Sequence, residues 1–355
     1  MDCRRPVLII LTLVFITCHP RIPVANAQKN SDRIQLHLNT DEADQVFAIL
    51  AKKSAGQAIL ESDWLTLFHT EPYVRLKKRE ASMKRDFTDE DFMNFVMSPE
   101  LAAKTDALRH TLDDWKKTDL KASAERVLSY LPGQATIHAK VFPVIKPKIN
   151  SFVFETQTDP AIFLYLDPRE SAPEFENTVA HELHHIGFAS VDFLAKAKLK
   201  DLAPNVKSAV EWMSAFGEGF AMLAAAGSPD VHPHAVSSAE ERARWDHDMA
   251  NFNQDLATLQ SFFLDIIDQK FKTDDAIREK ASEFYGVQGP WYTVGYKVAV
   301  IVEKRYGRAT LIDCMIDARE FLSRYNSAAA ELNRSQKDQL APWSPELMAK
   351  IGAAK

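Results

Sequence analysis

Residues 177–188 read NTVAHELHHIGF and contain His181-Glu182-Leu183-His184-His185, an H-E-x-x-H pattern. Residues four apart on an α-helix project from one face, so His181 and His185 would present two imidazoles side by side. Two such imidazoles can bind one Zn²⁺, and Glu182 lies about 100° further round the helix, within reach of a water molecule on that metal. The stretch therefore predicts a zinc site with an adjacent general base.

The residues around this pattern favour a buried helix. Ser171 and Glu174 have the spacing of a capping box, so a helix is predicted from about residue 172 to 188. The alternative is a surface helix with solvated histidines. Four apolar residues favour burial, where unpaired His and Glu would be costly: Val179, Ala180, Ile186 and Phe188. His184 faces a different direction from the other two histidines and is predicted to be a polar residue near the rim.

A catalytic zinc site needs a third protein ligand and an open fourth position. The positions that would hold the third histidine of a metzincin carry other residues, so a carboxylate on a later helix is expected. In residues 210–226, two carboxylates lie on a helix face of mostly small residues, which would let two helices pack closely. Glu218, between two glycines, is the first candidate. Glu211 is the alternative, and could instead orient a ligand histidine or be a solvated acid at a helix start.

Zinc-dependent hydrolysis also needs a donor for the developing oxyanion. Residues 289–296, GPWYTVGY, open a further predicted helix in which Tyr292 and Tyr296 are four apart and share a face. Either phenol could donate a hydrogen bond to the oxyanion. Tyr296 is the first choice and Tyr292 the second, and the alternative for both is an amphipathic tyrosine of the core.

The rest of the chain predicts an α+β fold that is mostly α-helical. Residues 41–130 have helical periodicity, whereas residues 135–145, 151–155 and 161–166 are rich in β-branched and aromatic residues typical of strands. From residue 171 onward the pattern is helical again. We therefore expect a helical N-terminal region (28–130) and a catalytic region (131–355) with a small sheet packed on the H-E-x-x-H helix. These two regions can also form one domain.

The first 27 residues have the layout of a secretory signal peptide. Arg4 and Arg5 precede an apolar run of about 12 residues, which is short for a membrane span, and Ala25-Asn26-Ala27 supplies a cleavage pattern. The alternative is an uncleaved anchor. Cleavage would leave an exported chain, secreted or periplasmic, with no stable membrane span.

Composition limits the partners of the mature chain. The full sequence has 46% hydrophobic and 26% charged residues, which is typical of a soluble globular protein. Removal of the signal peptide would take away three Arg and one Asp and move the net charge from -6 to about -8, which argues against nucleic-acid binding. Cys314 would be the remaining cysteine, and its apolar neighbours predict a buried thiol. Residues 232–248 hold a second group of His and Asp, predicted to be a solvated loop and not a second metal site.

Taken together, H-E-x-x-H followed by Glu218 in a Gly-Glu-Gly-Phe-Ala context resembles a gluzincin. More narrowly, the chain is similar, from about residue 45 to 330, to a family of uncharacterised exported proteins described as putative zinc-dependent peptidases. The resemblance implies His181, His185 and Glu218 as ligands of one Zn²⁺, Glu182 as the base, and a peptide or protein substrate. It also implies a zincin-like fold in which strand 161–166 is an edge strand that pairs with an extended peptide. The alternative is a wholly internal strand, because these residues are so apolar. Met222 takes the place of an Asp found in thermolysin-like gluzincins.

The function predicted from these features is an exported zinc metallopeptidase. One alternative is a zinc hydrolase that acts on a non-peptide amide or ester. Another is an inactive binding or scaffold protein that zinc stabilises. Glu182 favours an enzyme, because a structural zinc site usually has four protein ligands and needs no base. The residues do not indicate an oligomeric state.

Overall fold

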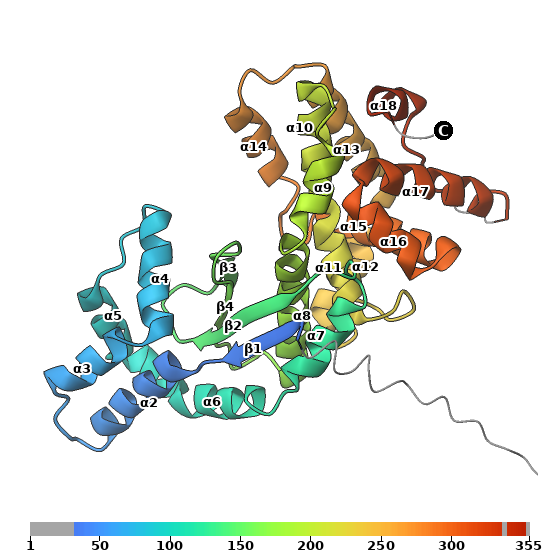
Figure 1. Cartoon of the computed structure of the whole chain (residues 1–355). Helices are drawn as coiled ribbons and strands as arrows, with labels where there is room; N and C mark the ends of the chain where they lie inside the picture. Colours follow the sequence, from blue (N-terminus) through green and yellow to red (C-terminus); the bar gives the residue numbers. More distant parts are fainter. Residues whose placement is uncertain (1–31, 336–338, 353–355) are drawn as a thin grey trace, which may run out of the picture.

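The computed structural model of the chain describes residues 32–335 and 339–352. The predicted signal peptide, residues 1–27, lies outside these described residues. The fold is α+β and mostly helical, as predicted, with one small mixed sheet among many helices (Figure 1).

The sheet has the strand order β1-β2-β4-β3. Its strands are β1 (Ile34–Leu38), β2 (Ile137–Val144), β3 (Phe152–Phe154) and β4 (Ala161–Tyr165). The first three in this order are parallel, with Ile34 opposite Ile137 and Lys140 opposite Ala161, whereas β3 runs antiparallel to β4. Most residues of β2 and β4 are buried, which suits parallel strands covered on both faces.

Two details of the sheet differ from the sequence prediction. β1 lies in the region predicted to be wholly helical, so it was missed. β4 lies between β2 and β3, so the prediction that strand 161–166 is an edge strand is wrong. The antiparallel β3 forms the edge on that side of the sheet.

From residue 32 onward, six helices precede the second strand, and most of them lie at one end of the sheet (Figure 1). They are α2 (Asp41–Ser54), α3 (Glu61–Phe68), α4 (Glu71–Ser82), α5 (Asp89–Val96), α6 (Pro99–Trp115) and α7 (Leu120–Leu128). The last two support the helix that carries the histidines. Trp115 at the end of α6 stacks on Phe175 with ring centroids 4.3 Å apart, and Ser123 of α7 donates a hydrogen bond to Glu176 at 2.8 Å.

The H-E-x-x-H sequence lies on α8 (Ala172–Ala189), as predicted. The predicted capping box begins it: the Glu174 carboxylate accepts a hydrogen bond from the Ser171 backbone N–H at 2.8 Å, and the Ser171 hydroxyl accepts one from the Glu174 N–H. At its other end, a Cβ on Gly187 would lie 2.3 Å from the Leu131 side chain, so α8 packs closely on the residues that lead into β2. These contacts fix the helix axis.

The C-terminal part of the chain is helical. Its elements are α9 (Asp192–Lys198), α10 (Pro204–Met213), the 3₁₀ turn η1 (Ser214–Phe216), α11 (Gly217–Ala226), α12 (Ala239–Met249), α13 (Phe252–Ile267), α14 (Asp274–Ser282), α15 (Pro290–Tyr306), α16 (Arg308–Ile316), α17 (Ala318–Leu332) and α18 (Pro345–Lys350). Residues 210–226, treated above as one continuous helix, are divided by η1, so α11 begins one residue before Glu218.

Two large hydrophobic cores follow from this arrangement. The first core joins the sheet, the N-terminal helices and α8, and the second core joins the C-terminal helices around α11, α13, α15 and α17. Helix α11 contributes to both, with Ala225 in the first core and Leu223 in the second. Across residues 32–335 and 339–352, no helix combines the length and apolar character that a membrane crossing requires.

Candidate metal centre

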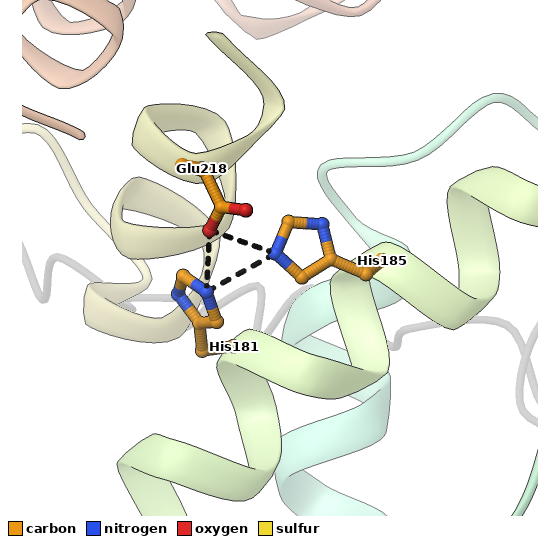
Figure 2. Close-up of side chains that lie close together, drawn as sticks. All are labelled: His181, His185 and Glu218. Atoms are coloured by element: carbon orange, nitrogen blue, oxygen red, sulfur yellow. Dashed lines mark hydrogen bonds and ion pairs between the residues drawn. The ribbon is translucent and has the colours of Figure 1, made fainter. Parts of the chain in front are cut away.

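Three side chains meet where α8 and α11 face each other. Figure 2 shows the imidazoles of His181 and His185 pointing from α8 toward the carboxylate of Glu218 on α11. The Nε2 atoms of the two histidines are 3.1 Å apart, and each lies 3.2 Å from Oε2 of Glu218. Among the described residues, these three form the group of His, Cys, Asp and Glu side chains whose ligand atoms converge closely enough to hold a metal ion. We call them the His-Glu cluster.

A close crossing of two helices places Glu218. A Cβ on Gly219 would lie 2.0 Å from the Tyr296 backbone nitrogen of α15, and a Cβ on Gly295 would lie 2.8 Å from the Phe216 carbonyl oxygen. No larger residue fits at either position without moving a backbone. The two glycines therefore let α11 and α15 touch, and this contact fixes the first turn of α11 opposite α8.

The electrostatics of the cluster follow from its burial and its short contacts. Burial alone would raise the pKa of Glu218, but the hydrogen-bonding histidines lower it well below the ordinary range. Burial alone would lower the pKa of His185, but its contact with Glu218 raises it. The carboxylate is therefore ionised at neutral pH, as a ligand carboxylate must be.

The donor set fits a zinc ion. Atoms bound tetrahedrally at about 2.0–2.1 Å from zinc are about 3.3–3.4 Å apart, close to the separations in the cluster. Protons alone do not satisfy all three contacts, because two N–H groups, or two lone pairs, would face each other in at least one of them. One cation between the three atoms satisfies every contact. Two imidazoles and a carboxylate are also a common set of protein ligands at catalytic zinc sites.

Glu182, the predicted base, follows His181 on α8 and is half-buried. Its carboxylate makes no hydrogen bond or ion pair with any described residue. It nevertheless lies near the cluster, since its charge contributes to the raised pKa values of His185 and Tyr292. It is thus a free carboxylate next to the candidate metal position.

The two predicted tyrosines differ in their surroundings. The ring of Tyr292 lies nearly parallel to that of His181, with centroids 6.1 Å apart, and burial together with the nearby Glu218 carboxylate raises its pKa. The hydroxyl of Tyr296 donates a hydrogen bond to the Val231 carbonyl at 3.3 Å, and its ring packs on Trp245. Tyr292 therefore lies beside the cluster, whereas the Tyr296 hydroxyl is bonded to the Val231 carbonyl.

Two further residues of the sequence prediction lie elsewhere. Glu211, the alternative ligand, is exposed on α10 and lies 3.8 Å from the ammonium of Lys207, outside the cluster. His184 is 1% exposed, so its prediction as a rim residue is wrong. Burial lowers its pKa well below the ordinary value, so its ring is neutral.

Two cavities reach the cluster from different sides. A polar cleft of about 1050 Å³ has His181 and Tyr292 in its wall. A second cavity of about 480 Å³, here called the His185 cavity, is lined by His185, Glu218 and Tyr285 among others. Tyr285 was missed in the sequence because it lies in the loop after α14, where no periodic pattern marks it. The three side chains of the cluster are thus divided between the walls of two cavities that share no lining residue.

The acidic side chains of the polar cleft lie near one another. Burial and the carboxylates of Glu174 and Asp167 raise the pKa of Glu170 to about 7, although Thr178 donates a hydrogen bond to it.

His232, from the second His and Asp group, lies 3.0 Å from Asp246, and within the described chain no third ligand atom converges on this pair.

Comparisons with known proteins point to the same chemistry as the site. No curated protein and no solved structure matches the chain. One family model does match, over residues 34–334, and its description is "Putative zinc dependent peptidase (DUF5700)". This match covers both histidines, Glu218 and both tyrosines, and it confirms the family resemblance inferred from the motif. The chain therefore belongs to the family described as putative zinc-dependent peptidases.

Proposed function

We propose that this protein is an exported peptidase that depends on a single zinc ion held by His181, His185 and Glu218. The observation that carries the proposal is the convergence of three donor atoms, 3.1–3.2 Å apart, beside the unpaired carboxylate of Glu182. A structural zinc site would leave no role for such a carboxylate and would usually have a fourth protein ligand. Membership of the family supports both the metal and the reaction class.

The side chains around the cluster have separate roles in this proposal. Zinc supplies Lewis acidity, which makes water a stronger acid and polarises a carbonyl group. Glu182 takes the proton from the attacking water and passes it to the leaving amine. Tyr292, whose raised pKa keeps the phenol protonated, donates a hydrogen bond to the oxygen that gains negative charge. Glu218 remains ionised throughout.

The shape of the site supports a peptide substrate over a small amide or ester. The polar cleft and the His185 cavity reach the cluster from different sides, so an extended chain can pass the metal position. Asn150 and Ser151, which lead into the edge strand β3, line the polar cleft. An extended substrate segment can therefore add to the free side of β3 through backbone hydrogen bonds. This assigns to β3 the role first predicted for β4.

Export is part of the proposal. Its support is the layout of residues 1–27, with a basic start, a short apolar run and a small-x-small cleavage pattern. The test is the mass of the mature chain recovered after expression with its own N-terminus. A chain that begins at Gln28 is expected, and one that retains Met1 in a membrane fraction would contradict it.

The zinc and peptidase roles are tested by elemental analysis and cleavage of a mixed peptide library. Wild type is compared with Glu182→Gln and with Glu125→Gln, an exposed carboxylate change on α7 that serves as the control. We expect one zinc per chain in all three and a loss of cleavage of about 10²–10⁴-fold in Glu182→Gln alone. Zinc without cleavage in wild type would favour a non-peptide substrate or a scaffold. Absence of zinc after metal-replete preparation would overturn the proposal.

A further inference from the structure

An apolar pocket lies beside the candidate metal centre, on the side of the His185 cavity. It has a volume of about 220 Å³ and is lined mainly by apolar side chains from the end of α8, from α10 to α11 and from α16 to α17. Its apolar walls include Phe188, Val210, Met213, Phe216, Phe220 and Phe321. We call it the apolar pocket.

The polar residues in its wall do not make it a polar site. Asp192 is paired with Lys196 at 2.6 Å, and Asp317 with Arg319 at 2.8 Å, so these charges are neutralised locally. Burial raises the pKa of the Cys314 thiol to about 12, so this side chain is a neutral part of the wall and not a nucleophile. Two further charged residues of the wall, Lys198 and Glu211, are exposed. Most of the surface left to a ligand is therefore hydrophobic.

The apolar pocket adjoins the cavity that reaches the cluster. Four residues line both the apolar pocket and the His185 cavity: Phe188, Glu211, Ser214 and Gly217. Phe188 lies three residues after His185 on α8, and Gly217 directly precedes Glu218. A group bound at the metal centre thus lies next to the opening of the apolar pocket.

Gly217 lies where the apolar pocket and the His185 cavity meet. An added Cβ on Gly217 would meet no atom of the described chain within 4 Å, whereas one on Gly219 would collide with the α15 backbone. The backbone at Gly217 is ordinary right-handed helix, with φ -51° and ψ -28°, which any residue adopts. Glycine in a helix is less favourable than alanine, and packing does not require it here. The absence of a side chain leaves open the space where the two cavities meet.

We infer that the apolar pocket is the specificity pocket of the enzyme and that it binds a hydrophobic substrate side chain adjacent to the cleaved bond. This inference rests on the proposed peptidase function. An apolar cavity of about 150 Å³ can hold benzene, so this pocket is large enough for a leucine or phenylalanine side chain. Gly217 determines the specificity, because it keeps the entrance from the His185 cavity open.

The test is a peptide library whose cleavage sites are identified by mass spectrometry, with kcat/KM then measured for matched peptides. The peptides differ only in having Leu, Phe, Ala or Gly at the preferred position. Wild type is compared with Gly217→Leu, which fills the junction, and with Gly217→Ala, which adds only one methyl group and is expected to fold. Gly133→Leu is the control, since Gly133 also has open space beside it and lines neither cavity.

We expect wild type and Gly133→Leu to prefer Leu or Phe over Gly by at least about tenfold, since one methylene in a hydrophobic pocket discriminates by that factor or more. Gly217→Leu should lose this preference, because kcat/KM falls more for the Leu and Phe peptides than for the Gly and Ala peptides, and it should retain its zinc. Binding of the uncleaved peptides to zinc-loaded Glu182→Gln, measured by fluorescence anisotropy, should show the same preference, and adding Gly217→Leu should remove it.

The outcomes separate this inference from the proposed function. Cleavage without an apolar preference, or a preference that survives Gly217→Leu, would overturn the specificity pocket and leave the peptidase standing. Zinc-loaded wild type that cleaves and binds none of the peptides would overturn both. If Gly217→Leu loses its zinc and Gly217→Ala does not, the alanine variant decides. A weaker apolar preference than in wild type would support the inference, and an unchanged preference would overturn it.

Discussion

The two hydrophobic cores of the molecule contribute to the His-Glu cluster in different ways. The first core supplies both histidines and Glu182 from one helix, α8, whose start is fixed by the Ser171 capping box and whose sides pack on α6 and α7. The second core supplies Glu218 and Tyr292 from two helices that touch through Gly219 and Gly295. The first contribution depends on local spacing, and the second on a tertiary contact.

The two contributions to the cluster are therefore sensitive to different structural changes. The imidazoles stay side by side as long as α8 remains helical, because the spacing of four residues guarantees it. The Glu218 carboxylate reaches the two imidazoles only if the contact between α11 and α15 holds the first turn of α11 opposite α8. The candidate metal centre therefore joins the two cores, and bound zinc is expected to stabilise their association.

The largest expected effect is the loss of zinc-dependent stabilisation in Glu218→Gln. At a free zinc concentration about 1000 times Kd, binding stabilises the folded wild type by about 4 kcal/mol, and a hundredfold weaker site would retain about 1.4 kcal/mol. Thermal unfolding with and without zinc measures this difference. Glu211→Gln serves as the comparison and should keep the full zinc-dependent shift. A normal shift in Glu218→Gln together with its loss in Glu211→Gln would assign the third ligand to Glu211.

The next effect concerns the first core alone. Burial raises the pKa of Glu42 from its ordinary 4.5 to about 8, even though its carboxylate accepts a hydrogen bond from the Ile145 N–H and lies near Lys146. The folded protein thus holds a proton that the unfolded chain releases above about pH 4.5. Stability is therefore lost as the pH rises from about 4.5 to 8, by up to about 1.4 kcal/mol per pH unit.

The test is denaturant unfolding of wild type and Glu42→Gln at several pH values from 5 to 7. We expect wild type to lose roughly 2–3 kcal/mol relative to the variant over this range, because the amide has no proton to release. Zinc content should be the same in both proteins, since Glu42 lies outside the cluster. If the free energies of unfolding of wild type and Glu42→Gln changed with pH in parallel, Glu42 would be ionised in the folded protein.

The smallest effects separate the two glycines that flank Glu218. Gly219→Ala forces a methyl group into the α15 backbone and should cost about 1–3 kcal/mol, and it should weaken zinc binding because Glu218 shifts. Gly217→Ala should raise the free energy of unfolding by up to about 1 kcal/mol, because alanine favours the helix and nothing obstructs it. Urea unfolding measures both. Equal destabilisation would contradict the idea that packing requires only one of these glycines.

Much of the first core's contribution could be predicted from the sequence. The α8 capping box, the H-E-x-x-H spacing and the apolar strands 137–144 and 161–165 are local signals, and the structure has all of these elements. β1 was missed because its five residues gain their stability by pairing with β2, about a hundred residues later in the chain. The order of β3 and β4 depends on the same kind of long-range pairing.

The second core's contribution was harder to predict. Tyr292 and Tyr296 are four residues apart on one helix, so their sequence positions do not show which one faces α8. The crossing with α11 decides this, and it turns Tyr296 toward Val231. The close approach predicted from the glycines occurs at Gly219, whereas Gly217 has space beside it. This difference appears only when the partner helix is in place.

The most direct test of the central claim is anomalous diffraction at the zinc absorption edge from crystals of the zinc-loaded mature chain. We expect one strong peak between the two cores, about 2.0–2.1 Å from Nε2 of His181, Nε2 of His185 and a carboxylate oxygen of Glu218. A peak at His232 and Asp246 instead, or a peak that Glu218 does not contact, would contradict it.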